Sequence, residues 1–277
     1  MNVYEIITEK IIERLESGDI PWHKPWTGDD WPKNLISKKE YRGINVFLLG
    51  CQKYSNPYWV TYKQAKQVGG NVKKGEKSSI IVFWKQIKVK DPVDPEKLIP
   101  MLRYYRVFNI EQCEGIDLKK IPVSEVNHDF QSIDACEKTI NDMQNKPNIE
   151  HGENKAYYRP STDIVNMPKK ENFVNEEFYY SVLFHEIGHS TGHKSRLDRK
   201  NFETGCFGSE TYTKEELVAE MTAAFMCGCH KIENKTLDNS AAYIKSWLRK
   251  LKNDPKMVVL AAAQAQKAAD YILNKIK

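Results

Sequence analysis

Residues 185–189 read His-Glu-Ile-Gly-His, a spacing that can bind a metal ion and activate water. If the segment is helical, positions i and i+4 lie on one face, so the imidazoles of His185 and His189 can bind one ion from adjacent turns. Glu186 is then close enough to take a proton from a water molecule at the metal. The motif is short and also occurs by chance, so the neighbouring sequence has to support this interpretation.

The flanking sequence predicts a helix over residues 175–192. Asn175 is a favourable N-cap, and two acidic residues follow it in the first turn, where the helix dipole stabilises negative charge. Gly192 is a common residue type at a helix end. Gly188 inside the helix costs about 1 kcal/mol relative to alanine, and we expect it to permit the close approach of another element beside the metal.

A catalytic zinc site requires a third protein ligand. His193 continues the same spacing, but a straight helix places it about 12 Å along the axis from His185, too far to share one ion. The better candidates are Glu216 and Glu220, one turn apart on the next predicted helix. We expect Glu216 to bind the metal and Glu220 to orient a histidine ligand. In the alternative, Thr213 and Glu216 form a capping box and Glu220 binds the metal.

Length and composition limit the class of protein. The chain has 277 residues, enough for two domains of moderate size, and no apolar stretch approaches the ~18 residues of a membrane span. Residues 1–22 form an amphipathic pattern interrupted by Glu and Lys, unlike a signal peptide. We therefore expect a cytoplasmic protein without a membrane partner. The six scattered cysteines contain no CxxC pair and are expected to be free thiols.

Basic charge is concentrated in residues 31–90, which contain thirteen Lys or Arg residues and two acidic residues. Five of the six tryptophans precede residue 85. Cations that follow phosphates, and rings that stack on bases for ~1–3 kcal/mol each, are typical of proteins that bind single-stranded nucleic acid. The charges alone could form a solvated surface and the rings alone could form a core. Together they favour nucleic-acid binding.

The predicted elements indicate an α+β protein with two domains, residues 1–125 and residues 126–277. For the first domain we expect helices at 3–17, 41–49 and 59–68 and a hairpin of strands at 79–89 and 102–109. For the second we expect, besides the two ligand-bearing helices, a helix at 132–144, short strands at 156–159 and 163–167, and closing helices at 240–251 and 255–276. An extended peptide would lie along the paired strands beside the metal helix.

Short motifs occur along both parts of the chain. In the N-terminal part they are Pro21-Trp-x-x-Pro-Trp26, Tyr41-Arg-Gly-Ile-Asn45, Trp59-x-Thr-x-x-Gln-Ala65, Gly70-x-Val-x-Lys-Gly-Glu76 and Val107-Phe-Asn-x-Glu-Gln-Cys113. In the C-terminal part they are His185-Glu-x-Gly-His-x-Thr-Gly-His193 and Glu215-Glu-Leu-Val-Ala-Glu220. These motifs resemble those of ArdC-type antirestriction proteins, and the resemblance covers most of residues 1–230, in the same order as in the family.

The resemblance implies a plasmid- or mobile-element-borne protein with an N-terminal domain that binds single-stranded DNA and a C-terminal zincin-like (gluzincin) metallopeptidase domain. Such proteins are associated with protecting incoming DNA from restriction during conjugation. The implied metal ligands agree with His185, His189 and Glu216, holding Zn²⁺, although Mn²⁺ or Co²⁺ also suits a His₂Glu site. Charge pattern and resemblance together give the predicted DNA-binding residues: Trp22, Trp26, Lys33, Tyr41, Arg42, Asn45, Trp59, Lys73, Lys74, Lys77 and Trp84.

Two functions are consistent with these features. In the first, the protein is a zinc metallopeptidase that cleaves a protein or peptide, with Glu186 as general base. In the second, it only coats and protects single-stranded DNA, and its metal site is structural or non-catalytic. A nuclease is a weaker third possibility, because nucleases more often use clustered carboxylates with two ions. We expect the first two functions to coexist, one in each domain.

Overall fold

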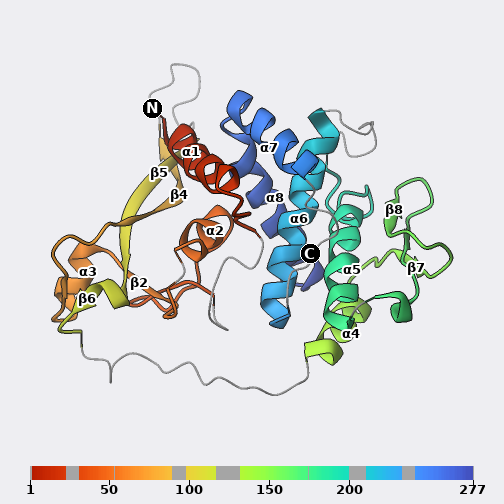
Figure 1. Cartoon of the computed structure of the whole chain (residues 1–277), viewed down its shortest axis with the longest axis horizontal. Coiled ribbons are helices and arrows are strands. Elements are labelled where there is room, and N and C mark those ends of the chain that lie inside the picture. Colours follow the sequence, from red (N-terminus) through yellow and green to blue (C-terminus); the bar gives the residue numbers. More distant parts are fainter. Residues whose placement is uncertain are drawn as a thin grey trace. The chain divides into compact units, whose positions relative to one another are not determined.

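The protein folds into two compact units, as seen in a computed structural model that describes residues 2–22, 31–52, 54–88, 98–116, 132–173, 175–199, 210–232 and 241–276. Unit 1 comprises Met1–Ile7 and Pro25–Glu125, and unit 2 comprises Thr8–Lys24 and Val126–Lys277. Both units contain helices and strands (Figure 1). The predicted α+β fold with two domains is therefore confirmed.

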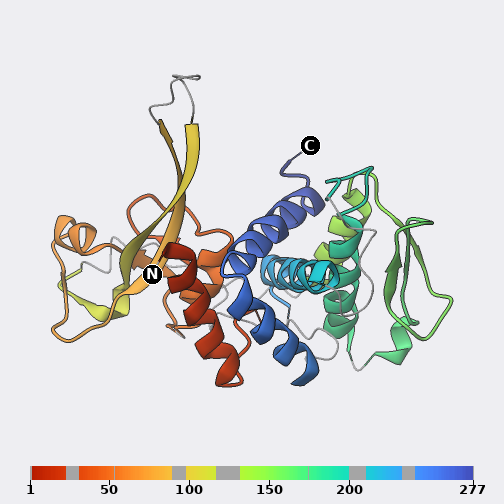
Figure 2. The same cartoon turned by 90° about the horizontal axis from the view of Figure 1, so that it is seen from above.

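Unit 1 is built around a four-stranded sheet with the strand order β1-β2-β5-β4. β1 (Lys33–Asn34) runs parallel to β2 (Tyr58–Val60), which pairs antiparallel with the end of β5 (Leu98–Asn109). β5 in turn pairs antiparallel with β4 (Ser79–Lys88) along the full length of β4. The β4–β5 pair forms the long twisted hairpin visible in Figures 1 and 2. A small second sheet joins β3 (Asn71–Val72) to β6 (Cys113–Glu114), which follows the 3₁₀ helix η1 (Ile110–Gln112).

The helix predicted at residues 59–68 begins later than expected. Tyr58–Val60 forms the buried strand β2, and the helix α3 spans Tyr62–Gln67. The hydroxyl of Thr61 accepts a hydrogen bond from the backbone N–H of Gln64, whose side chain in turn accepts one from the backbone N–H of Thr61. This capping box sets the helix start and leaves the preceding apolar run free to pair as a strand.

The helix α2 (Ile44–Gly50) packs against β4 and buries every one of its residues. Asn45 links the two elements by hydrogen bonds: its side-chain amide donates to the carbonyl of Val82 and accepts from the N–H of Val82, both at 2.7 Å. Because β4 is an edge strand of its sheet, the amide of Asn45 pairs backbone groups that a neighbouring strand would otherwise bond.

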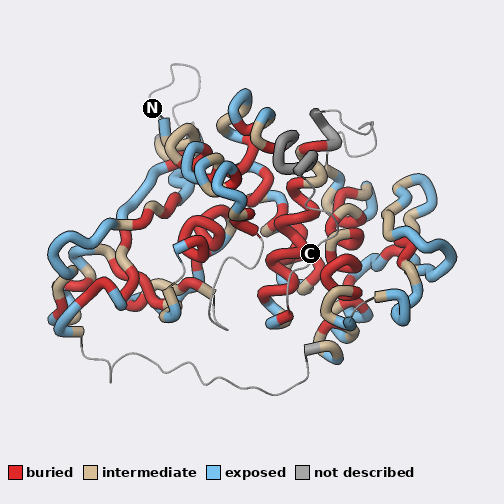
Figure 3. Tube along the Cα trace, viewed as in Figure 1, coloured by how far each residue is buried: buried red, intermediate tan, exposed pale blue. Residues whose placement is uncertain are grey.

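Unit 2 contains a small sheet and a group of helices. Its sheet has the order β7-β9-β8, with β7 (Asn148–Glu150) parallel and β8 (Tyr157–Arg159) antiparallel to β9 (Ile164–Asn166). The helices are α4 (Ser132–Asp142), η3 (Lys170–Asn172), α5 (Glu176–Ser190), α6 (Glu210–His230), α7 (Ala241–Asn253) and α8 (Met257–Ile272). α5 and α6 lie side by side and are mostly buried (Figure 3).

Part of the N-terminal helix α1 (Val3–Glu16) belongs to unit 2. The hydroxyl of Thr8 donates to the carbonyl of Pro255 at 2.7 Å, and Lys252 forms an ion pair with Glu16. Beyond the helix, Trp22 is fully buried with its ring edge-on to Trp247, centroids 5.2 Å apart. The predicted bounds, residues 1–125 and 126–277, assign Thr8–Lys24 to the first domain, whereas this segment packs with the C-terminal helices of unit 2. Of the helices that the structure describes, none is long and apolar enough to cross a bilayer.

Candidate metal centre

The helix α5 presents His185 and His189 on one face, as the spacing predicts. Its N-cap is Asn175, whose side chain accepts a hydrogen bond from the N–H of Phe178 at 2.8 Å. The helix runs to Ser190, so the two histidines lie one turn apart in its C-terminal half. Both imidazoles are only 14% exposed.

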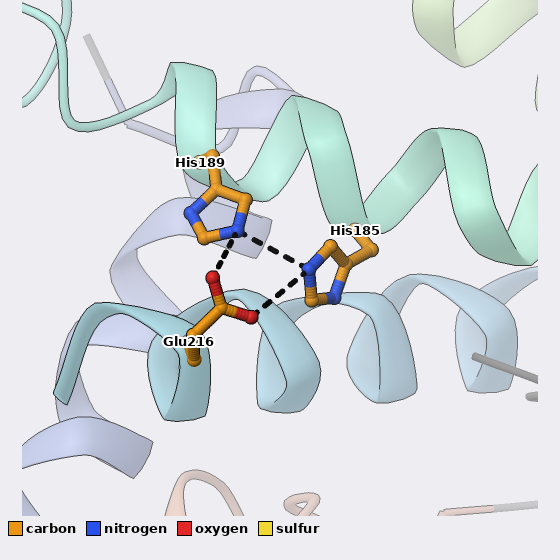
Figure 4. A group of neighbouring side chains, drawn as sticks. All are labelled: His185, His189 and Glu216. Atoms are coloured by element: carbon orange, nitrogen blue, oxygen red, sulfur yellow. Dashed lines mark hydrogen bonds and ion pairs between the residues drawn. The ribbon is translucent and has the colours of Figure 1, made fainter. Parts of the chain in front are cut away.

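Glu216 of α6 completes a group of three ligand atoms (Figure 4). The Nε2 atoms of His185 and His189 lie 3.2 Å apart. The two carboxylate oxygens of Glu216 lie 3.6 Å from Nε2 of His185 and 3.4 Å from Nε2 of His189. Ligand atoms about 2.1 Å from a tetrahedral zinc are about 3.4 Å from one another. The three side chains therefore fit a single divalent metal ion.

Each histidine has a second carboxylate within ion-pair distance of its other ring nitrogen. An oxygen of Glu220 lies 3.6 Å from Nδ1 of His185, and an oxygen of Glu215 lies 3.6 Å from Nδ1 of His189. Such partners set the orientation and basicity of metal-binding imidazoles. The position of Glu220 was predicted from helical spacing. Glu215 was not predicted, although its place directly before Glu216 was a usable signal.

Arg199 holds Glu215 in place and closes the end of α5. Its guanidinium forms an ion pair with both carboxylate oxygens of Glu215. It also donates to the carbonyls of Gly188 and His189, at 3.0 and 3.3 Å, and to the hydroxyl of Thr191. A cation at this end of the helix complements the helix dipole. Arg199 was not identified from the sequence, because it lies in the chain beyond the helix.

Gly188 permits α6 to approach α5 closely, as expected. A Cβ atom placed there would lie 3.2 Å from Cβ of Thr222 and 3.4 Å from Cα and O of Ala219. The distance to Thr222 is shorter than the optimum carbon–carbon separation of about 3.5–4.0 Å, whereas the two distances to Ala219 are ordinary contacts. The glycine thus brings the helix that bears Glu216 and Glu220 within reach of the two histidines.

The competing interpretation of Glu216 as a helix cap does not match α6. The helix begins at Glu210, so Thr213 lies inside its first turn and not at the N-cap position. Glu216 is then in the body of the helix, directed at the histidines (Figure 4). His193 lies beyond the end of α5, where its Nδ1 is 2.8 Å from the hydroxyl of Ser195. Among the described residues, it is not part of the group of metal-binding atoms.

Glu186 is buried beside the two histidines and is joined to the strand β8. Its carboxylate accepts a hydrogen bond from the backbone N–H of Tyr158. Burial raises the pKa of Glu186, and this effect exceeds the opposing influence of His185 and His189. A buried carboxyl group with a raised pKa next to a metal-binding group is typical of an acid–base catalyst.

The charges within the group are mutually stabilising. Burial would raise the pKa of Glu216, but His189 and His185 hold it well below its ordinary value. Burial would also lower the pKa of His185 and of His189, but contacts with Glu216 and its neighbouring carboxylates raise both. The neighbouring carboxylates therefore favour the protonated form of both imidazoles, and protons compete with a metal ion for them.

A buried arginine ties β8 to the metal helix. The side chain of Arg196 is fully buried and donates to the carbonyl of Ser190 at 2.6 Å. It also forms a bidentate ion pair with Asp163, which follows the strand β8 and accepts a hydrogen bond from the hydroxyl of Tyr158 at 2.7 Å. These contacts fix β8 relative to α5, and with it the N–H group from which Glu186 accepts a hydrogen bond.

The structure divides the predicted DNA-binding residues into two groups. Buried members, with at most 5% exposure, are Trp22, Tyr41, Asn45 and Trp59. A ring with almost no exposed surface has no face on which a base can stack, and the amide of Asn45 is bonded to the backbone of Val82, so these four residues have structural roles in the core. Members with exposed or partly exposed side chains are Lys33, Arg42, Lys73, Lys74, Lys77 and Trp84. Trp26 lies outside the described residues.

Comparison with known proteins identifies relatives of both units. Residues 1–108 match a family described as the N-terminal domain of anti-restriction factor ArdC, and residues 135–264 match one described as zincin-like metallopeptidase. Among solved structures, the metal-free crystal structure of antirestriction ArdC from plasmid R388 is 36% identical, with a TM-score of 0.81 and full coverage of both chains. The Mn(II)-bound structure of the same protein is 35% identical, with a TM-score of 0.80, and covers 99% of this chain and 98% of that one.

Curated relatives include two proteins named DNA primase TraC from Escherichia coli. They are 37% and 36% identical over 98% of this chain, which spans 27% and 20% of their own lengths. A protein designated y4eC from Sinorhizobium fredii is 34% identical over 98% of this chain and 91% of its own length.

Proposed function

This chain belongs to the ArdC family of antirestriction proteins, and on that basis we propose that each of its two units has its own activity. Unit 2 hydrolyses a peptide bond with the help of a divalent metal ion, and unit 1 binds single-stranded DNA. Together they protect the DNA of a mobile element, such as a conjugating plasmid, in the cytoplasm of a restricting recipient. The observation that carries the peptidase proposal is the three-ligand geometry of His185, His189 and Glu216.

The donor set supports zinc as the resident metal. Two imidazoles and one carboxylate are a common zinc ligand set in hydrolytic sites. Mn²⁺ and Co²⁺ suit the same donors, and a relative has been crystallised with Mn(II). When bound, the metal supplies Lewis acidity: it lowers the pKa of water to about 7 and polarises a carbonyl group.

Glu186 is the proton carrier in this proposal. It takes a proton from the attacking water as the oxygen bonds to the carbonyl carbon. It then gives that proton to the amine nitrogen as the carbon–nitrogen bond breaks. Its raised pKa supports both directions of transfer, and the N–H of Tyr158 orients its carboxylate.

The strand β8 is the proposed binding edge for an extended substrate. It is the last strand in the order β7-β9-β8, so one of its edges has no strand partner within this sheet. Tyr158 directs its N–H to Glu186, which places that edge beside the acid–base group. A peptide that adds to the sheet there would have its backbone next to Glu186.

The replacement Glu186→Gln tests the peptidase proposal. It keeps the size of the side chain and all three ligands but removes the proton carrier. We expect unchanged zinc binding by calorimetry and a loss of about 10²–10⁴-fold in hydrolysis of a quenched fluorescent casein probe. Glu176→Gln, an exposed position on the same helix, is the matched control and should retain activity.

A restriction-protection assay separates the two candidate functions. Plasmid transfer into a restricting recipient is measured with wild type, Glu186→Gln and Glu176→Gln. If hydrolysis is needed, only Glu186→Gln should lose protection. If Glu186→Gln protects as well as wild type, hydrolysis is not needed, and coating of single-stranded DNA is the better explanation. The basic charge of residues 31–90 also favours coating.

The DNA-binding proposal is tested by the salt dependence of binding to a labelled single-stranded oligonucleotide. The basic turn after β3 carries Lys73, Lys74 and Lys77, all exposed, and Lys73 also donates to the carbonyl of Glu111 at 2.8 Å. Reversing these charges should weaken binding and lower the slope of log Kd against log salt concentration by about 0.7 for each phosphate that the protein no longer neutralises. An unchanged slope would show that this turn does not bind DNA.

A further inference from the structure

The outer part of the β4–β5 hairpin carries exposed rings that the core does not need. Phe83, Trp84, Tyr104 and Tyr105 are each 41–48% exposed. Large exposed aromatic side chains that gather on one element indicate a binding surface, because monomeric proteins rarely leave such patches uncovered.

The register of the hairpin sorts these rings onto two faces. Phe83 lies opposite Arg103, and Lys85 lies opposite Met101. Tyr105 is opposite Ile81, and residues two apart on a strand point to the same side. One face therefore carries Phe83, Lys85, Arg103 and Tyr105, which we call the Phe83 face. Trp84 and Tyr104 lie on the other face, where the ring of Tyr4 is 6.2 Å from that of Trp84.

The Phe83 face is an extension of the core of unit 1. Nearer the base of the hairpin, the same face contributes Ile81 and Val107 to a buried cluster that includes Tyr41. The ring of Tyr41 is 6.4 Å from that of Phe83, and Phe83 contacts Tyr105 edge-on with centroids 5.8 Å apart. The buried ring of Tyr41 thus supports Phe83, and Phe83 in turn supports Tyr105, so little side-chain entropy is lost when a ligand stacks on them.

The charge of the hairpin selects an anionic ligand. The described strands β4 and β5 contain Lys85, Lys88, Arg103 and Arg106 and no acidic residue. Lys85 and Arg103 are exposed on the same face as the two rings. Rings beside cations are the combination that binds bases and phosphates together.

We propose that the Phe83 face is the surface on which single-stranded DNA binds, with bases stacked on Phe83 and Tyr105 and phosphates near Lys85 and Arg103. The proposal rests on the proposed function of unit 1 and identifies where that function resides. Only unpaired bases offer a free ring face, so the surface favours single strands over duplex. Tyr41, predicted as a DNA contact, instead supports Phe83 from the core.

The experiment compares three labelled oligomers of equal length by fluorescence anisotropy: a mixed-sequence single strand, its duplex, and an abasic single strand. The double variant Phe83→Ala/Tyr105→Ala of the full chain should bind the single strand on the order of 100-fold more weakly than wild type. Its affinity for the abasic strand, which has phosphates but no bases, should be within about twofold of the wild-type value. Arg103→Gln should weaken binding to both single strands.

Tyr62→Ala is the matched control, because Tyr62 is 54% exposed in unit 1, has a Lys66 ammonium 5.8 Å from its ring, and lies on α3 and not on β4 or β5. It should bind like wild type, and circular dichroism should show that every variant is folded. If wild type binds no single strand, the proposed function fails. If wild type binds and Phe83→Ala/Tyr105→Ala binds equally well, or loses equal affinity for the abasic strand, the Phe83 face is not the stacking surface.

Discussion

Replacing Gly188 by alanine tests whether the spacing of two helices controls the metal site. The residue lies in α5 between the two histidine ligands, and α6 passes directly over it. An added methyl group touches neither a ligand nor the strand edge proposed to bind the substrate. Its effect has to act through the separation of α5 and α6.

The magnitude follows from the contacts. The new Cβ would lie 3.2 Å from Cβ of Thr222 and 3.4 Å from Cα of Ala219. The helices must therefore separate by at least about 0.3 Å to reach ordinary carbon–carbon distances. Alanine gains about 1 kcal/mol in helix propensity, and overpacking costs about 1–3 kcal/mol. The metal-free protein should thus lose no more than about 2 kcal/mol of unfolding free energy.

The metal site should be more sensitive than the fold. Ligand distances tolerate deviations of about 0.2 Å, and Glu216 moves with α6. We expect zinc affinity to fall about 10- to 100-fold, the range found for changes just outside a ligand set. Competition with a fluorescent chelator measures this affinity, and urea unfolding measures stability.

The matched control is Gly152→Ala in the same unit, where an added Cβ meets only Oδ1 of Asn166 at an ordinary 3.5 Å. Its zinc affinity should equal that of wild type. If Gly188→Ala also binds zinc within twofold of wild type, the close approach of the helices does not control the site and the reasoning fails.

Three further predictions concern single side chains. Glu220→Gln should lower zinc affinity about 10- to 100-fold by calorimetry, and full affinity would exclude its role in orienting His185. Asn45→Ala should lower the free energy of unfolding in urea by about 1–3 kcal/mol, because it leaves backbone groups of Val82 unpaired; an unchanged midpoint would contradict this. Burial lowers the pKa of His230 in the folded protein to about 4. As the pH falls, the unfolded chain therefore takes up a proton on this histidine before the folded protein does. The free energy of unfolding should decrease as the pH falls from about 6.5 to 4. His230→Phe should remove on the order of 1–3 kcal/mol of that loss. If the free energy of unfolding depends on pH in the same way in His230→Phe and in wild type, His230 is not the group responsible.

The metal centre was largely predictable because its geometry is local. The i, i+4 spacing fixes the relation of His185 to His189, and the same rule relates Glu216 to Glu220. Arg199 was not predictable, since its contacts depend on how the chain turns back after α5. No periodic pattern marks such a return.

The roles of the aromatic residues in the N-terminal part were not predictable, because their burial depends on contacts between distant segments. Composition indicated rings and cations in the N-terminal part but could not separate core from surface. Trp59 lies in the unbroken apolar run Tyr58–Val60, which is typical of a strand buried on both faces. Phe83 and Tyr105 become neighbours only through the register of β4 with β5, and pairing between distant strands cannot be read from either strand alone.

Unit 2 is formed by two segments that are far apart in the sequence, and this affects folding during synthesis. Trp22 is synthesised 225 residues before its partner Trp247, which at about 5–20 residues per second corresponds to a delay on the order of 10–45 s. Until the C-terminal helices are made, this indole and the part of α1 that belongs to unit 2, which begins at Thr8, have no native site to occupy. A nascent chain stalled before α7 should therefore expose Trp22 to chaperones, and a fragment that starts at residue 126 would leave Trp247 uncovered in the same way.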